Sequence, residues 1–170
     1  MEDNKMREIK VEKLTINIGS GSEDSVNNNA KKLLKVITGK EPSPGISKKR
    51  LPAFKISKGQ AIAAYVTVRG ADIKPLAEKL FDAVQNRIKD SGIRENTASF
   101  GIHEYIDIRG VKYDPKIGML GMNVNLSFKR AGARVALRKR RRASVPERHR
   151  VVSREEIKQY LKQNFKVEAQ

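Results

Sequence analysis

The chain has 170 residues, of which 36 are Lys or Arg and 19 are Asp or Glu, and its formal net charge is +17. Such an excess of like charge repels itself unless an anionic partner is present, and the usual partners are nucleic acid, an acidic protein or an anionic membrane surface. The absence of cysteine excludes a disulfide framework, a zinc knuckle and a thiol nucleophile. Hydrophobic residues make up 38% of the chain, enough for a core, so we expect one domain over residues 1–170.

No apolar run approaches the roughly 18 residues that are needed to span a bilayer. Residues 1–10 lack the apolar stretch of a secretory signal. We therefore expect a cytoplasmic protein with no membrane partner. Positive charge is densest in residues 129–150, which hold ten Lys or Arg and one Glu, but the remaining chain is also basic.

Alternation of polar and apolar residues predicts a first strand over residues 10–19. A glycine-rich turn follows, and helical spacing of apolar residues predicts a helix over residues 23–38 with Ser22 as its N-cap. Residues 40–52 show no periodicity and contain three prolines, so we expect a long, mobile, basic loop. The clearest alternation then predicts a strand over residues 60–70.

A second helix is expected over residues 72–90, capped by Asp72 and carrying an apolar stripe. Residues 94–99 are polar and indicate a loop, whereas residues 100–108 indicate a short strand and a turn of helix. Strict alternation returns over residues 121–130 and predicts the third main strand.

An arginine-rich segment, residues 134–150, follows this strand directly. Ser153 and Glu156 have the spacing of a capping box, in which each side chain bonds the other's backbone N–H. The capping box predicts a C-terminal helix over residues 153–165.

All three main strands alternate cleanly, which indicates a sheet with one buried face and one free face. Because two long helices separate the strands, we expect an α+β fold: an antiparallel sheet with helices on one side and an open polar face on the other. The expected outward residues are Thr15, Asn17, Tyr65, Thr67, Arg69, Asn123, Asn125, Ser127 and Lys129. These carboxylate-free, mostly short groups can reach RNA phosphates, sugars and base edges, although an ordinary solvated face would also alternate.

Two basic segments lie outside this face. The loop contributes Ser47, Lys48, Lys49 and Arg50, and the arginine-rich segment contributes Arg134, Arg138, Lys139, Arg140, Arg141, Arg142, Arg148 and Arg150. The alternatives are a solvated turn for the loop and a disordered tail or targeting signal for the arginine run. Because that run lies between a strand and a capped helix, we favour a phosphate-binding arm, for which the arginine guanidinium is suited.

Catalysis has little support. His103, Glu104 and Asp107 could be imagined as metal ligands of an RNA-processing enzyme, but no recognised metal motif surrounds them. The glycine-rich turn at residues 19–21 lacks the lysine and spacing of a phosphate-binding loop. We expect no enzyme activity, no metal and no cofactor; a metal-dependent RNA-processing enzyme and an acidic-protein-binding module remain the alternatives.

Four strings carry a resemblance to a known family: EKLTINIG at 12–19, LLKVITGKEP at 33–42, FKISKGQAIAAYVTVRG at 54–70 and FGIHEYIDIRGVKYDPKIGMLGM at 100–122. Together they resemble the universal large-subunit ribosomal proteins that bind 5S rRNA, numbered five in bacteria and archaea and eleven in eukaryotes. The arginine-rich segment and the C-terminal helix are similar to the archaeal and eukaryotic form. The resemblance spans nearly the whole chain.

The resemblance implies a structural protein of the central protuberance that binds 5S rRNA, neighbouring 23S rRNA and adjacent ribosomal proteins. It also implies 5S rRNA contacts at Asn17, Lys40 and Thr67. At the middle position the chain departs from the bacterial pattern, since Lys40 and Glu41 stand where Gln and Lys are usual. The basic loop, residues 40–52, is implied to contact the P-site tRNA.

Overall fold

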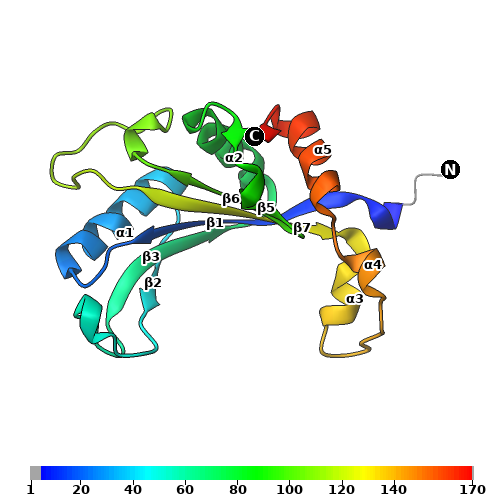
Figure 1. Ribbon diagram of the computed structural model, residues 1–170, viewed down its shortest axis with the longest axis horizontal. Helices are drawn as coiled ribbons and strands as arrows, with labels where there is room; N and C mark the ends of the chain where they lie inside the picture. The colour runs from blue at the N-terminus through cyan, green and yellow to red at the C-terminus, as the bar shows by residue number, and fades with distance from the viewer. Residues whose placement is uncertain (1–4, 170) are drawn as a thin grey trace.

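A computed structural model describes residues 5–169 and shows a twisted six-stranded sheet (Figure 1). Its strands are β1 (Ile9–Gly19), β2 (Ser43–Ile46), β3 (Ala61–Val68), β5 (Ile93–Arg94), β6 (Thr97–Ile102) and β7 (Met122–Arg130). Their order is β2-β3-β1-β7-β6-β5, and each neighbouring pair is antiparallel. A separate parallel pair joins β4 (Arg87–Ile88) to β8 (Glu168–Ala169). Residues 1–4 and 170 lie outside the described residues. They include the ends of the domain expected over residues 1–170 and part of the N-terminal stretch expected to lack a secretory signal.

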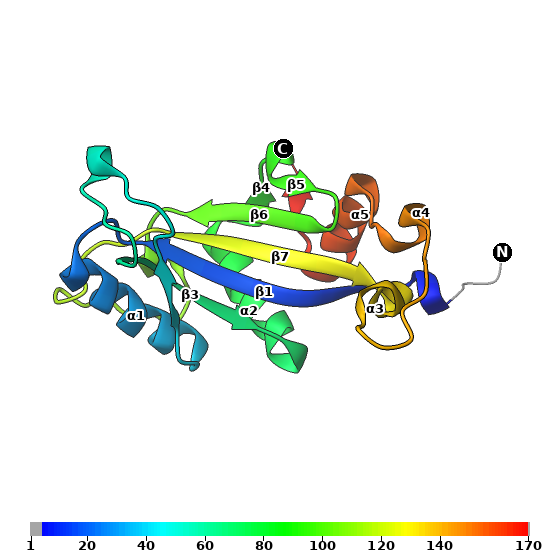
Figure 2. The same ribbon diagram turned by 90° about the horizontal axis from the view of Figure 1, so that it is seen from below.

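The three longer helices gather on one side of the sheet. They are α1 (Asp24–Thr38), α2 (Ile73–Ala83) and α5 (Arg154–Phe165), with the short α3 (Arg134–Leu137) and α4 (Glu147–Arg150) at one end. Viewed from below, β1, β6 and β7 lie in front, with α2 and α5 behind them (Figure 2). The expected α+β fold, with helices on one face of an antiparallel sheet, is confirmed. None of the helices within residues 5–169 is long and apolar enough to cross a membrane.

Side-chain alternation places the core between the sheet and these helices. Along β7, Val124 and Leu126 are fully buried, while the intervening Asn125 is only half-buried. Burial of each large aliphatic side chain contributes about 1.5–3 kcal/mol. From the helix side, Phe81 on α2 stacks on Phe100 of β6, with ring centroids 5.0 Å apart. The strands and helices are therefore held together by a single apolar layer.

The second helix is shorter than expected. It ends at Ala83, and Gln85 and Asn86 then adopt left-handed backbone conformations with φ of 56° and 57°. The prediction of a helix to residue 90 is wrong. It was made because apolar residues continue at helical spacing past this turn. Ile88 is buried from strand β4 rather than from a helical face.

Residues 94–99 are not a loop, as their polarity suggested. Arg94 pairs with Thr97 across a tight turn, and β6 begins at Thr97. In the turn, Asn96 takes a φ of 58°, which asparagine tolerates better than most residues. Its Oδ1 accepts a hydrogen bond from the Val152 N–H at 2.8 Å. The polar residues here stabilise the turn that connects two strands. Because polar residues are typical of a loop, the sequence pattern did not predict the strand. The strand and helical turn expected over residues 100–108 are present, the turn as a short 3-10 helix at Tyr105–Asp107.

The prediction of a loop over residues 40–52 is also wrong in part, because Ser43–Ile46 forms edge strand β2 against β3. Two expected caps differ as well. Helix α1 begins after Glu23 instead of Ser22, and Asp72 makes no side-chain capping hydrogen bond at α2. The capping box of Ser153 and Glu156 is present, as expected.

We predict that Leu126→Ala lowers the free energy of unfolding by about 2–5 kcal/mol, the usual loss for a buried leucine. Its neighbour Asn125 projects to the other face, so Asn125→Ala should change stability by less than about 0.5 kcal/mol. Urea denaturation followed by circular dichroism measures both. Equal losses from the two variants would mean that both sheet faces are packed.

Candidate nucleic-acid interface

Polar residues on three neighbouring strands form continuous rows across the free side of the sheet. In one row, Thr67 on β3 lies opposite Thr15 on β1, and Thr15 lies opposite Asn125 on β7. Ser99 on β6 lies opposite Asn125 and extends the row to a fourth strand. Directly opposed residues have Cβ atoms about 4.5–5.5 Å apart, so these side chains form one contiguous surface.

The adjacent row has the same character. Tyr65 on β3 lies opposite Asn17 on β1 and Ser43 on β2. Asn17 lies opposite Asn123 on β7, which in turn lies opposite Gly101 on β6. The structure thus brings together most of the residues that the sequence placed on a free face. We call this surface the open face; its members are Thr15, Asn17, Tyr65, Thr67, Ser99, Asn123, Asn125, Ser127 and Lys129, each half-buried or exposed.

A β-bulge gives the open face an acidic neighbour that alternation did not reveal. The register of β1 shifts between Val11 and Lys13. Because of this shift, Val11 and Leu14 both pack against the core, although they are three positions apart in the strand. The extra residue, Glu12, forms an ion pair with Lys129 of the open face at 3.4 Å. The carboxylate-free prediction therefore holds for the open-face residues themselves but not for their surroundings.

Two basic segments project from the sheet on the side away from α2 and α5 (Figure 1). One follows β2 and is here called the basic arm, residues 47–58. The other is the arginine-rich segment, residues 134–150, which contains α3 and α4. They stand at opposite ends of the sheet, and the open face lies between them.

The basic arm is tied together by hydrogen bonds. Ser47 is buried, and its Oγ donates to the Lys49 carbonyl at 2.6 Å while its N–H donates to the Gln60 carbonyl at 2.8 Å. Leu51 and Ile56 exchange two backbone hydrogen bonds of 2.9 and 3.1 Å. Ser47 therefore shapes the arm and is not available at its surface, whereas Lys48, Lys49 and Arg50 are all exposed.

Two further predicted residues lie at the edge of the open face. Arg69 follows β3 and is exposed. Lys40 follows the end of α1, and its Nζ forms an ion pair with Asp72 at 2.9 Å. Both partners are well exposed, so the pair contributes little stability and leaves the lysine able to exchange Asp72 for another anion.

The arginine-rich segment displays most of its charge to solvent. The exposed members are Arg134, Arg138, Lys139, Arg140, Arg141, Arg142 and Arg148, and Arg150 is half-buried. Within the segment, the Arg138 Nε donates to the Arg141 carbonyl at 2.8 Å. The like charges of this segment repel one another, which favours an external anion as the partner.

The base of the segment is held by Arg130, which sequence reasoning assigned no role. Its Nη2 lies 2.8 Å from both carboxylate oxygens of Glu156, and its Nε donates to the Val151 carbonyl at 3.1 Å. Burial of the Glu156 carboxyl opposes ionisation, but hydrogen bonds from Ser153 and the Arg130 charge outweigh it, so the pKa of Glu156 lies below its ordinary 4.5. This ion pair joins the end of β7 to the start of α5, with the whole arginine-rich segment between them.

A shallow hollow of about 370 Å³ lies where the open face meets the arginine-rich segment. Its lining includes Lys13, Ser127 and Lys129 from the sheet and Leu137 and Arg150 from the segment, together with the carboxylates of Glu12 and Glu147. The open face and the arginine-rich segment are therefore one continuous surface.

The residues imagined as metal ligands do not form a site. His103, Glu104 and Asp107 are all exposed. Within residues 5–169, no group of three or more His, Cys, Asp or Glu side chains is arranged to hold a metal ion.

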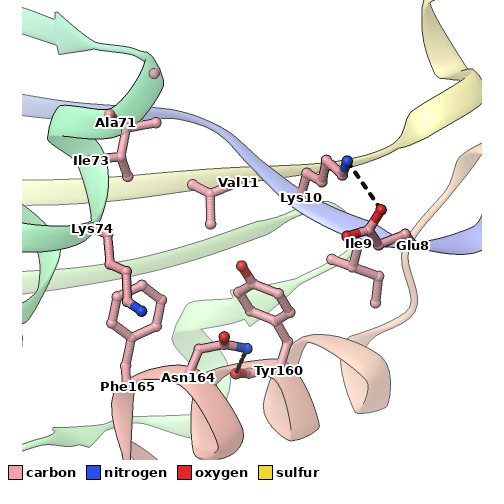
Figure 3. A pocket seen from close by; sticks show the side chains of 11 residues that line it. Glu8, Ile9, Lys10, Val11, Ala71, Ile73, Lys74, Tyr160, Asn164 and Phe165 are labelled. Carbon is pink, nitrogen blue, oxygen red and sulfur yellow. Dashed lines mark hydrogen bonds and ion pairs between the residues drawn. The ribbon is translucent and has the colours of Figure 1, made fainter. Parts of the chain in front are cut away.

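A larger pocket, of about 460 Å³, opens on the helix side between the start of β1, α2 and α5 (Figure 3). Its walls include Val11, Ile73, Tyr160 and Phe165, and a Glu8–Lys10 ion pair of 3.0 Å lies at its edge. None of the residues that the sequence predicted as binding residues lines this pocket.

Fold and surface together define a basic α+β protein suited to a polyanion. Comparison with known proteins identifies the family. The family model described as "Ribosomal protein L5" matches residues 4–56, and the model that describes the C-terminus of the same ribosomal family matches residues 61–160.

Three archaeal relatives are similar over nearly their full length, and each is named "Large ribosomal subunit protein uL5". The protein of Sulfurisphaera tokodaii is 43% identical over 165 residues, covering 96% of this chain and 93% of the relative. That of Methanosphaera stadtmanae is 40% identical, covering 96% and 98%. That of Aeropyrum pernix is 42% identical, covering 95% and 85%.

The chain belongs to the uL5 family of ribosomal proteins, in its archaeal form. It is accordingly a structural constituent of the large subunit of the cytoplasmic ribosome and not an enzyme. The expectations of family, class and location are confirmed.

Because its pKa is lowered on folding, Glu156 stabilises the protein above its unfolded pKa, and that contribution is lost as pH falls through the folded pKa. Glu156→Gln removes the ion pair with Arg130, and because the Glu156 side chain is 37% exposed and partly screened by solvent, the free energy of unfolding at pH 7 should fall by only about 1 kcal/mol. It should also reduce the loss of stability below about pH 4.5. Urea denaturation between pH 3 and pH 7 measures both.

Glu155→Gln is the matched control, because Glu155 is exposed on the same turn of α5. It should change stability by less than about 0.5 kcal/mol and preserve the wild-type pH profile. If the two variants had the same profile, the ion pair would not hold this end of the fold.

Proposed function

We propose that the chain binds 5S rRNA through its open face and neighbouring 23S rRNA through the arginine-rich segment, as part of the central protuberance beside other ribosomal proteins. In this proposal the basic arm contacts the P-site tRNA. The observation that carries the proposal is a continuous polar surface, whose own residues include no carboxylate, with a basic segment at each end, both projecting to the same side.

The chemistry of the open face suits RNA. Asparagine amides donate and accept at base edges, and threonine hydroxyls reach ribose 2′-hydroxyls and phosphates. Asn17 and Thr67 stand in adjacent rows of the open face on neighbouring strands, within reach of one bound RNA segment. They are proposed as 5S rRNA contacts together with the other open-face residues Thr15, Tyr65, Asn123 and Asn125, and with Lys40 and Arg69 at its edge.

The two basic segments have a different role in RNA binding. Arginine and lysine contacts to phosphate supply affinity and orientation without reading sequence. The proposed phosphate contacts are Arg134, Arg138, Lys139, Arg140, Arg141, Arg142, Arg148 and Arg150. For the tRNA we propose Lys48, Lys49 and Arg50; Ser47 supports them from within the basic arm, because its side chain is buried and bonded to Lys49.

Affinity for a 5S rRNA transcript should fall steeply with salt, with log K dropping by about 0.7–0.9 per neutralised phosphate for each log unit of salt. Asn17→Ala and Thr67→Ala should each weaken this binding by about tenfold while random duplex RNA is bound as before, because base-edge and ribose contacts are lost. Filter binding across a salt series measures both effects.

Asn28→Ala is the control for Asn17→Ala, since Asn28 is exposed on α1 at the helix side. It should bind the transcript as the wild type does. A salt-independent affinity, or equal losses on transcript and random duplex, would contradict recognition of 5S rRNA by the open face.

Replacing Lys48, Lys49 and Arg50 together with alanine should weaken P-site tRNA binding to reconstituted large subunits by about tenfold, equivalent to 1.4 kcal/mol. Incorporation of the variant into the subunit should be unchanged, because the proposed 5S rRNA contacts are intact. Equilibrium binding of labelled tRNA measures the loss.

The matched control removes three exposed lysines of the helix side, Lys74, Lys79 and Lys89. It changes net charge by the same amount, so an equal loss of tRNA affinity from this control would assign the effect to general charge rather than to the basic arm.

A further inference from the structure

One aromatic ring stands on the otherwise aliphatic and polar open face. Tyr65 is 40% exposed at the middle of β3, although its neighbours Ala64 and Val66 are buried on the opposite face. We propose that Tyr65 and the small residues beside it form a binding site for one unpaired nucleobase of the RNA. This inference rests on the proposed function and adds how the open face distinguishes RNA with unpaired bases from a regular duplex.

The residues next to Tyr65 leave space for a flat ligand. In the adjacent row, Ala63 on β3 lies opposite Gly19 on β1 and Gly45 on β2. A Cβ added at Gly19 would meet no atom within 4 Å, so the surface beside the tyrosine is open there. At Gly45 an added Cβ would come within 3.0 Å of the Ala63 Cβ, so the row is closely packed there. Because none of the three residues has a side chain larger than a methyl group, the row stays low beside the phenol ring.

The row in which Tyr65 itself stands supplies polar groups. Asn17 and Ser43 lie directly opposite Tyr65 on the two flanking strands, and Asn123 follows Asn17 in the same row. No hydrogen bond within the described residues ties any of these three side chains to another part of the fold. An amide and a hydroxyl at the edge of a ring give donors and acceptors for the edge of a base that stacks on it.

An unpaired base fits this arrangement better than a duplex does. The bases of an A-form duplex have their faces covered by their neighbours, so a protein ring can reach only the groove and the backbone. A base that has left the stack can lie on the tyrosine, and stacking of this kind tolerates any base because each has a π face. The amides of Asn17 and Asn123 then add selectivity at the base edge.

The test compares Tyr65→Ala, Tyr65→Phe and Tyr65→Trp in the full-length protein with two probes: a 5S rRNA transcript and a fully paired duplex of similar length. Base stacking is worth about 1–3 kcal/mol, so Tyr65→Ala should weaken transcript binding about 5- to 150-fold. Stacking is not ionic, so the slope of log K against log salt should be unchanged. Tyr65→Phe and Tyr65→Trp should stay within about twofold of the wild type, and duplex binding should not change.

Fluorescence reports the contact directly. The chain contains no tryptophan, so Tyr65→Trp introduces a single indole on the open face. Its emission should be quenched by the transcript and not by the duplex, because only the unpaired base stacks on the ring. Tyr113→Ala, which removes an exposed tyrosine from the connection between β6 and β7, is the matched control and should leave transcript affinity within about twofold.

The outcomes separate this site from the proposed function. If Tyr65→Ala bound the transcript as tightly as the wild type, or Tyr65→Phe lost as much as Tyr65→Ala, or Tyr113→Ala lost as much, the base site would be refuted while RNA binding by the open face stood. An equal loss on transcript and duplex would refute it too. Failure of the wild-type protein to bind the transcript would instead refute the proposed function itself.

Discussion

The structure depends on a one-sided hydrophobic layer. Along most of β1, β3 and β7 every second residue is buried on the side of the long helices, and the residues between them face away from those helices. Near Ser127 and Lys129 the short α3 and α4 lie beside the open face. Burial of that layer supplies the favourable free energy of folding, so the opposite face contributes little to stability and its side chains can be chosen for chemistry. A polar, carboxylate-free surface across three strands can therefore be kept without loss of the fold.

The two basic segments are each attached to the rest of the fold by defined contacts. The arginine-rich segment is joined at its base by the Arg130–Glu156 ion pair, and the basic arm by the buried Ser47 and the Leu51–Ile56 bridge. Arg130 and Ser47 therefore have structural roles, while the remaining cationic side chains of the two segments lie at the surface. Affinity from phosphates and selectivity from the open face can then act on one RNA, because the three parts project to one side.

Strict alternation was enough to predict the three main strands, the free face and most of its residues, since a period of two assigns each side chain to a face. What broke the alternation was not predictable: the bulge that brings Glu12 to Lys129 adds one residue without a sequence signal. The hairpin at residues 94–99 was not predicted because its residues are polar. Its turn is stabilised by a hydrogen bond between Asn96 and Val152, 56 positions away in the sequence. The roles of Arg130 and Ser47 likewise depend on partners that only the folded chain brings together.

The most direct test of the account is an amide chemical-shift titration of the 19.1 kDa protein with a 5S rRNA transcript. If RNA binds the open face, shifts are expected in the residues of β1, β3 and β7 that carry the open face and in the arginine-rich segment, whereas the exposed sides of α1, α2 and α5 stay unchanged. Shifts confined to those helices, or to the pocket between α2 and α5, would contradict it.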